Sequence, residues 1–150
     1  MARPTHYQNQ YRQQLLERIR SLPEQVFKRQ DLVTDRSNQS QLRLNRALKA
    51  FVKQGYIKKI AHGLYAKAMQ IGLPEGNQQT VLQDSFESVA IQALDKIGIR
   101  WDLGTSIQEY NRGETTQVPA VFSVRLRSRY RGTIRAEGKT LHFEGDVNAR

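Results

Sequence analysis

Amide and guanidinium side chains concentrate between residues 37 and 46, and basic side chains continue to residue 62. Gln can pair bidentately with adenine and Arg with guanine, whereas Lys and Arg farther along a helix meet phosphate groups. The spacing therefore predicts a surface that hydrogen-bonds to DNA bases at one end and holds the DNA backbone at the other. The candidate DNA-binding residues are Ser37, Asn38, Gln39, Gln41, Arg43, Arg46, Lys49, Lys53, Lys58, Lys59 and His62.

The charge of the chain is unevenly distributed. The 150 residues carry a formal net charge of +10. Residues 1–69 hold 14 Lys and Arg against 4 Asp and Glu, while residues 70–150 hold 10 of each. Residues 36–67 contain no acidic side chain at all. Because a merely solvated surface usually mixes both signs, this pattern favours a polyanionic partner.

The elements that would position these residues form a predicted winged helix-turn-helix domain over residues 10–68, after a flexible arm at 1–9. A helix over 11–22, an extended piece at 26–27 and a brief helix over 29–34 precede the long helix over 39–54. Gly55 occupies the left-handed position that ends a helix. Strands over 56–60 and 64–66 follow, joined by a turn at His62-Gly63. The predicted buried stripe of the long helix is Leu44, Ala47, Leu48, Phe51 and Val52.

The second half of the chain predicts a small α+β domain with an antiparallel sheet. Gly72, Pro74, Gly76 and Asn77 suggest a linker over 69–80. Apolar residues at helical spacing then predict a helix over 81–97, with a helical turn at 106–110. Strands are expected over 121–127, 133–136 and 140–144. The small domain therefore covers residues 81–150, and the fold class is α+β.

A second basic cluster lies in the first of those strands. Strand side chains alternate between two faces, so the alternation predicts one shared face for four arginines. These are Arg125, Arg127, Arg129 and Arg131. Such a face suits DNA phosphate, an acidic surface of another protein, or plain solvent on the uncovered side of a sheet. The sequence leaves these alternatives open.

Other classes of function find little support in the sequence. The chain has no cysteine, and its three histidines are far apart without a carboxylate at ligand spacing, so no metal site is expected. No phosphate-binding loop or catalytic set of residues is present, which argues against an enzyme and against a cofactor. No stretch approaches the ~20 apolar residues of a membrane span, and residues 1–10 do not form a signal peptide. We expect a cytoplasmic protein without a membrane partner.

The residues also carry a resemblance to a known family. The segment from Phe27 to Tyr65, with its Gly55 and its Gly63-Leu64-Tyr65, resembles the winged-helix domain of AbiEi-type antitoxins, which belong to bacterial type IV toxin–antitoxin systems. Residues 101–143 are similar to the downstream part of related, largely uncharacterised bacterial regulators. That similarity rests on Gly104-Thr105-Ser106, Tyr110-Asn111, residues 115–119 and the arginine-rich strand.

Two functions remain as hypotheses. The first is a sequence-specific regulator of transcription, a repressor that binds double-stranded DNA. Because one such domain reads few base pairs, we expect it to act as a homodimer, at least on DNA, at an inverted repeat. The second is a protein-interaction module, an antitoxin or adaptor whose C-terminal domain binds a partner protein.

Overall fold

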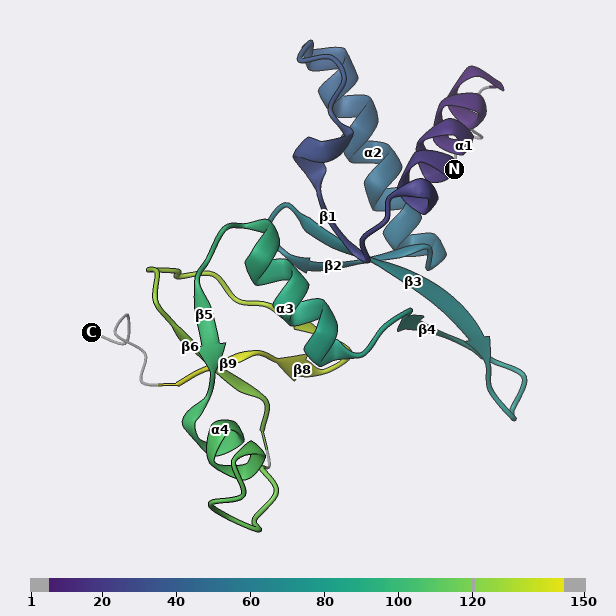
Figure 1. Ribbon diagram of the computed structural model, residues 1–150. Helices are drawn as coiled ribbons and strands as arrows, with labels where there is room; N and C mark the ends of the chain where they lie inside the picture. Colours follow the sequence, from purple (N-terminus) through teal and green to yellow (C-terminus); the bar gives the residue numbers. More distant parts are fainter. Residues whose placement is uncertain (1–5, 120, 145–150) are drawn as a thin grey trace. The chain divides into compact units, whose positions relative to one another are not determined.

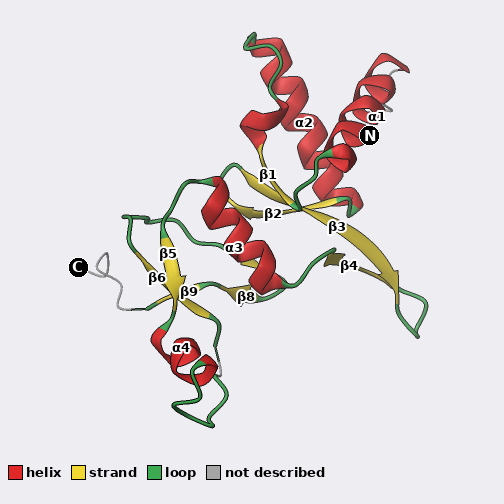
Figure 2. Ribbon diagram, viewed as in Figure 1, coloured by secondary structure: helices red, strands yellow, loops and turns green. Residues whose placement is uncertain are grey.

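The chain is a mixed α+β protein with helices and sheets in both halves (Figures 1 and 2). The computed structural model describes residues 6–119 and 121–144. Two compact units are present. The first takes the residues up to Lys59 and Gly63–Gln83, and the second takes Ile60–His62 and the residues from Asp84 on.

Two long helices, α1 (His6–Ser21) and α2 (Asn38–Gln54), build the core of the first unit (Figure 1). Leu15 and Ile19 of α1 are buried in one cluster with Leu48 and Phe51 of α2. Apolar residues three and four positions apart line one side of a helix, so each helix turns a single stripe inward. The first helix was predicted to start at Tyr11. In the structure it starts at His6, within the segment that was expected to be a flexible arm. Residues 1–5 of that segment lie outside the described residues.

The expected second helix is present only as a short 3-10 turn. The strand β1 (Val26–Lys28) leads directly into one 3-10 turn, η1 (Arg29–Leu32). The backbone N–H of Lys28 donates to the Asp31 carboxylate at 3.0 Å, which fixes the start of this turn. Val33 is already extended, so the helix predicted over 29–34 is shorter than expected.

The sheet of the first unit runs in the order β1-β3-β2, with β4 also paired to β3. Its strands β2 (Ile57–Ala61) and β3 (Leu64–Gly72) are joined by the predicted turn at His62-Gly63. The rings of Phe27 and Tyr65 stack at 5.8 Å between centroids across the β1–β3 pair. The predicted hairpin is therefore present, and its second strand is longer than expected.

Residues 69–80 form a β-hairpin, so the prediction of a linker there is wrong. β4 (Gln78–Leu82) pairs antiparallel with β3, from Ala68↔Leu82 to Gly72↔Gln78. The glycines and Pro74 mark the turn, where the N–H of Leu73 donates to Asn77 O at 2.7 Å. The alternation in Met69-Gln70-Ile71 is only three residues long, and β4 begins with Gln78-Gln79-Thr80, so neither strand is recognised from its sequence over these residues. The first unit consequently extends to Gln83 and not to residue 68.

The second unit is built around α3 (Phe86–Lys96). Ser85 caps it by accepting from the N–H of Ser88 at 3.1 Å, so the helix starts later than the predicted residue 81. The buried face of α3 consists of Phe86, Val89, Ala90, Ala93 and Leu94. The expected helical turn is α4 (Thr105–Asn111).

Short strands complete the second unit. β5 (Trp101–Leu103) pairs antiparallel with β6 (Ser123–Leu126), which pairs parallel with β9 (His142–Phe143). The sheet is therefore mixed, and not purely antiparallel as predicted. β7 (Arg135–Ala136) and β8 (Lys139–Thr140) form a separate hairpin around a turn at Glu137-Gly138, where both residues have a positive φ.

Gly55 provides a test of how the β3–β4 hairpin packs on the end of α2. It has a φ of 83°, and a Cβ there would meet Thr80 Oγ1 at 2.8 Å and Gln70 Nε2 at 2.7 Å. We expect Gly55→Ala to lower the free energy of unfolding by about 1–3 kcal/mol from backbone conformation, with a further loss from crowding. Chemical denaturation measures this loss.

Gly76→Ala is the matched control. Gly76 has a φ of 90° and open space around its Cβ position, so its substitution carries the backbone cost alone. Equal losses for the two variants would show that the hairpin does not pack against the end of α2.

Candidate nucleic-acid interface

One face of α2 is exposed and carries four of the seven predicted contact residues that lie on this helix. Its residues are spaced three and four apart, so they form one line opposite the buried stripe. Leu42, on this line, has 53% of its surface exposed. We call this line the α2 ridge. It consists of Gln39, Leu42, Arg46, Lys49 and Lys53.

The start of α2 is held by a carboxylate and two hydroxyls. Ser37 caps the helix by accepting from the N–H of Ser40 at 3.2 Å. Asp35 accepts from the backbone N–H of Ser37 at 3.0 Å and from the hydroxyls of Ser40 and Ser37 at 3.0 and 3.1 Å. These bonds, that from the Ser37 N–H most of all, lower the pKa of Asp35. Ser37, a predicted DNA contact, therefore already has a structural role at the cap.

The pKa shift of Asp35 links the helix cap to pH. Because the folded chain favours the ionised carboxylate, its stabilising contribution is present above the ordinary carboxyl pKa and is lost as pH falls through the lowered value. Asn38 and Gln39 follow this cap and are exposed. Within the described part of the chain, neither amide forms a side-chain hydrogen bond, so both are available to a partner.

Gln41 is not available to a partner, because both ends of its amide form hydrogen bonds within the protein. Its amide nitrogen donates to Asp35 O at 3.2 Å, and its oxygen accepts from Arg29 Nη2 at 2.5 Å. Arg29 Nε also donates to Asn45 Oδ1 at 2.7 Å. Gln41 therefore connects η1 to α2, although the sequence predicted a base contact.

Arg43 is held between the two helices and not on the exposed ridge. Its guanidinium carbon lies 4.2 Å from the ring centroid of Tyr11 and 5.8 Å from that of Tyr7. Its Nη1 donates to the Tyr7 hydroxyl at 3.2 Å. Its Nε is buried without a hydrogen-bond partner among the described residues, so the face of Tyr11 compensates part of that cost. Neither tyrosine was among the predicted site residues, although their i, i+4 spacing places them on one side of α1.

The β2–β3 hairpin presents part of its predicted basic set. Lys59 and His62 are exposed, while Lys58 is half-buried. Lys67, which contributes to the basic run in the sequence, is buried. Its ammonium donates to the carbonyl oxygens of Leu22 and Arg20 (3.4 Å for the latter) at the C-terminal end of α1, and burial lowers its pKa. Lys67 is therefore a structural cation of the first unit.

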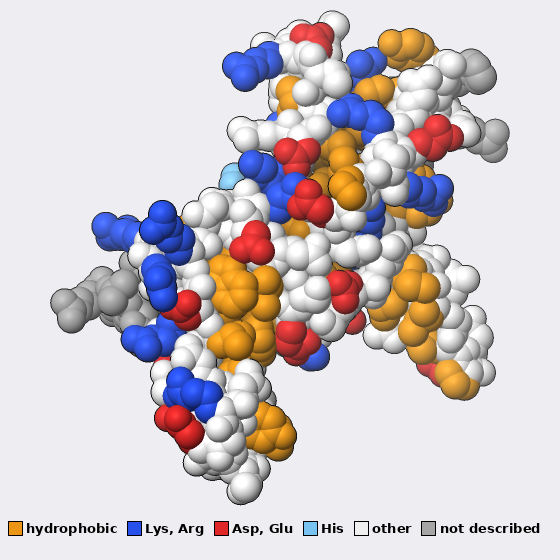
Figure 3. Space-filling model, viewed as in Figure 1, with side chains coloured by type: hydrophobic (Ala, Val, Ile, Leu, Met, Phe, Trp, Pro, Cys, Tyr) orange, Lys and Arg blue, Asp and Glu red, His pale blue; other side chains and the backbone are white. Residues whose placement is uncertain are grey.

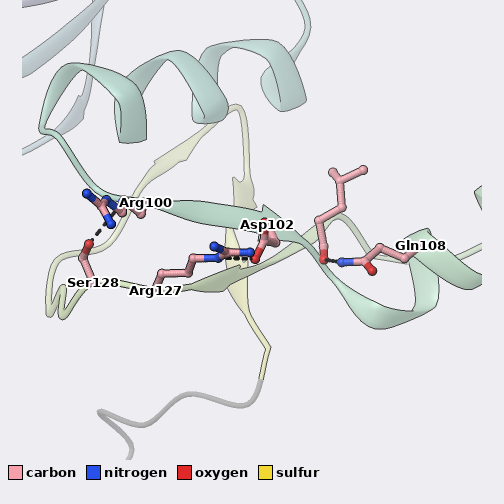
Figure 4. A network of polar contacts seen from close by, with 6 residues as sticks. Arg100, Asp102, Gln108, Arg127 and Ser128 are labelled. Carbon is pink, nitrogen blue, oxygen red and sulfur yellow. Dashed lines mark hydrogen bonds and ion pairs between the residues drawn. The ribbon is translucent and has the colours of Figure 1, made fainter.

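The four C-terminal arginines do not share one strand, because β6 ends at Leu126. Figure 4 shows the reason. The Ser128 hydroxyl accepts from the Arg100 N–H at 3.3 Å, and Arg127 Nε meets the Asp102 carboxylate at 2.6 Å (Figure 4). The N–H of Arg127 still donates to Arg100 O at 2.8 Å, and after this last backbone bond the Arg100 N–H is bonded by a side chain and not by a backbone carbonyl. In the same view, Gln108 of α4 donates to the carbonyl of Leu103.

The arginines also differ in how far their charge is compensated. Arg127 is paired with Asp102, and Arg125 lies opposite Asp102 in the β5–β6 register. The pKa of Glu144 is lowered, first by hydrogen bonding to Thr105 and to a smaller extent by Arg125. Arg129 and Arg131 form no hydrogen bond or ion pair with any described residue. Figure 3 shows basic side chains on this unit with acidic ones among them.

The described residues form neither a metal site nor a membrane-spanning helix. Among residues 6–119 and 121–144, no group of three or more His, Asp and Glu is arranged to hold a metal ion. In the same residues no helix has the length and apolar character needed to cross a membrane. Comparisons with models of protein families, with curated proteins and with solved structures found no match to this chain.

Two arginines one helical turn apart should respond differently to substitution. We expect Arg43→Ala to lower the free energy of unfolding by about 1–2 kcal/mol, because it removes the stack on Tyr11 and the bond to Tyr7. Arg46→Ala on the exposed ridge should stay within about 0.5 kcal/mol of the parent. Urea denaturation of both variants measures the difference, and equal stability would contradict a structural role for Arg43.

Proposed function

We propose that this protein binds double-stranded DNA through the α2 ridge and regulates transcription, acting as a repressor. The observation that carries the proposal is the composition of that exposed face. The amide of Gln39 stands at its N-terminal end, with Asn38 beside it, and three cations follow, with no acid in the sequence from residue 36 to 67. Amides at the start of a helix suit base edges, and the cations suit phosphate.

The order of elements in the first unit supports a winged helix-turn-helix. The order α1-β1-η1-α2-β2-β3 places the ridge helix after a short turn and before a hairpin. In this proposal α2 enters the major groove, and the β2–β3 hairpin, with Lys59 and His62, lies along the neighbouring backbone. The resemblance to AbiEi-type antitoxins agrees with a bacterial regulator that acts in the cytoplasm. Such a regulator would bind an inverted repeat as a homodimer.

Fewer residues are available for base contacts than the sequence predicted. Asn38 and Gln39 are the free amides at the start of α2, while Gln41 and Arg43 are committed to contacts within the protein. We therefore assign base contacts to Asn38 and Gln39. Arg46, Lys49 and Lys53 would bind phosphate.

A protein-interaction role for the second unit is the second candidate. The observation that favours it is a group of exposed apolar side chains around α4 and the segment after it. Val118 has 66% of its surface exposed, and Val121 and Tyr110 are also exposed. Exposed apolar groups of this kind mark protein contacts more often than nucleic-acid contacts. In this version the second unit binds a partner protein, as an antitoxin or adaptor does.

The salt dependence of DNA binding tests the role of the ridge. Replacing Arg46, Lys49 and Lys53 together by Gln should reduce the magnitude of the slope of log K against log salt by about two to three units, because each phosphate contact contributes about 0.9. Fluorescence anisotropy with a labelled duplex, measured over a range of salt concentrations, gives both slopes.

A charge-matched variant separates local contact from net charge. Replacing Lys96, Arg112 and Lys139 by Gln removes the same charge from the second unit, where Arg112 and Lys139 face acids. This control should keep most of the parent slope. If both triple variants lose the same amount, α2 makes no specific phosphate contacts and the proposal fails.

The arginine cluster of the second unit can be tested by comparing its own members. If it also binds phosphate, Arg129→Ser with Arg131→Ser should reduce the slope by about two units. Arg125→Ser with Arg127→Ser should reduce it less, because those cations lie beside Asp102 and Glu144. If the DNA affinity of both pairs is unchanged while the assembly of the protein is lost, the cluster binds protein and not DNA.

A further inference from the structure

A hollow between the N-terminal halves of α1 and α2 is lined by three arginines and by no acid. Its volume is about 390 Å³, and Arg12 of α1 faces it together with Arg43 and Arg46 of α2. Within the described residues, Arg12 and Arg46 form no hydrogen bond or ion pair. Three like charges around one hollow repel one another, and an anion between them would relieve that repulsion.

The rest of the lining limits the kind of anion. The rings of Tyr7 and Tyr11 and the side chain of Leu42 also face the hollow, so its wall is apolar as well as basic. Arg43 is held in place by these tyrosines, which means that its guanidinium is fixed before any ligand arrives. A pocket of this size with apolar walls and a few fixed polar groups has the character of a small-molecule site.

The shape of the site argues against DNA as the occupant. Arg12 and Arg43 are half-buried, whereas the α2 ridge is exposed along its length. A rigid duplex contacts a convex helix face, whereas a half-buried guanidinium in a hollow is reached more easily by a small molecule. Arg46 and Leu42 belong both to the ridge and to the hollow. A ligand in the hollow therefore changes two side chains that the proposed DNA-binding face uses.

We propose that this hollow binds a small organic anion, a carboxylate or phosphate monoester on a flat apolar body, and that the bound ligand weakens DNA binding by α2. The anionic group would bind Arg12 and Arg46 beside the fixed Arg43, and the flat body would lie against the tyrosines and Leu42. The binding step is independent of the proposed DNA-binding function. The regulatory step rests on that function.

The direct test is calorimetric titration of the full chain with benzoate and with phenyl phosphate. Benzamide serves as the neutral isostere of benzoate, and inorganic phosphate as the anion without a flat body. We expect saturable binding of at least one aromatic anion, with benzamide and inorganic phosphate at least tenfold weaker. Shifts of the ring signals of Tyr7 and Tyr11 in an NMR titration would locate the ligand in the hollow.

Arg12→Gln is the decisive variant because Arg12 lies outside the α2 ridge. It should lower the affinity for the aromatic anion about tenfold or more, since a hydrogen bond to a charged group is lost. Arg112→Gln, which removes one charge from an exposed ion pair of the second unit, is the matched control and should bind as the parent does. No saturable binding in the millimolar range, equal binding of benzamide, or equal binding of inorganic phosphate would overturn the proposal.

Competition with DNA separates the two proposals. Addition of the bound anion should raise the dissociation constant of the parent for duplex DNA and should have much less effect on Arg12→Gln. If Arg12→Gln itself lowers the salt slope by a full phosphate contact, the hollow is part of the DNA interface and the small-ligand proposal is wrong. If the anion binds while the protein binds no DNA, the anion site stands and the proposed function fails.

Discussion

The burial of one stripe of α2 against α1 determines what the first unit presents to its surroundings. Leu44, Ala47, Leu48 and Phe51 are nearly inaccessible and belong to the same cluster as Leu15 and Ile19 of α1. Burial of side chains of this size contributes about 1.5–3 kcal/mol for each large one. Once that stripe is fixed, the helical period places the ridge on the opposite side. The position of the basic surface is therefore a consequence of the packing of the core.

The same constraint explains which parts of the interface were predictable from sequence. Helical spacing assigns Arg46, Lys49 and Lys53 to the exposed side, and the structure agrees. Arg43 and Gln41 lie at the two margins of that side, where the environment depends on the neighbouring elements. Arg43 meets the tyrosines of α1, and Gln41 meets Arg29 from η1. Val52 lies at a margin of the buried stripe and is 39% exposed, although sequence analysis placed it in the core.

The elements themselves were predictable where a local signal is strong. Ser37 and Gly55 mark the ends of α2, as a capping serine and a left-handed glycine do. The β3–β4 hairpin was missed because its glycines and Pro74 suit a turn and a linker equally well. Its strands carry glutamines on both faces, so no alternation distinguished the two. The strand with the arginines was predicted too long because the backbone pairing ends with the bond from the Arg127 N–H to Arg100 O, and the Ser128 hydroxyl then accepts from the Arg100 N–H.

The commitment of Arg43 to α1 has a consequence for how a duplex would be recognised. The cations of the exposed ridge have long flexible side chains. Such side chains bind the phosphate groups of DNA whatever the base sequence. Asn38 and Gln39 remain for base edges, and each good bidentate pair gives about 1–3 kcal/mol of discrimination. One copy of the first unit would therefore hold DNA mainly by charge and select few base pairs. Specific regulation then requires two copies on one site, or a second contact from the unit that carries Arg129 and Arg131. The contacts that hold Arg43 and Gln41 within the protein thus strengthen the requirement for a second contact.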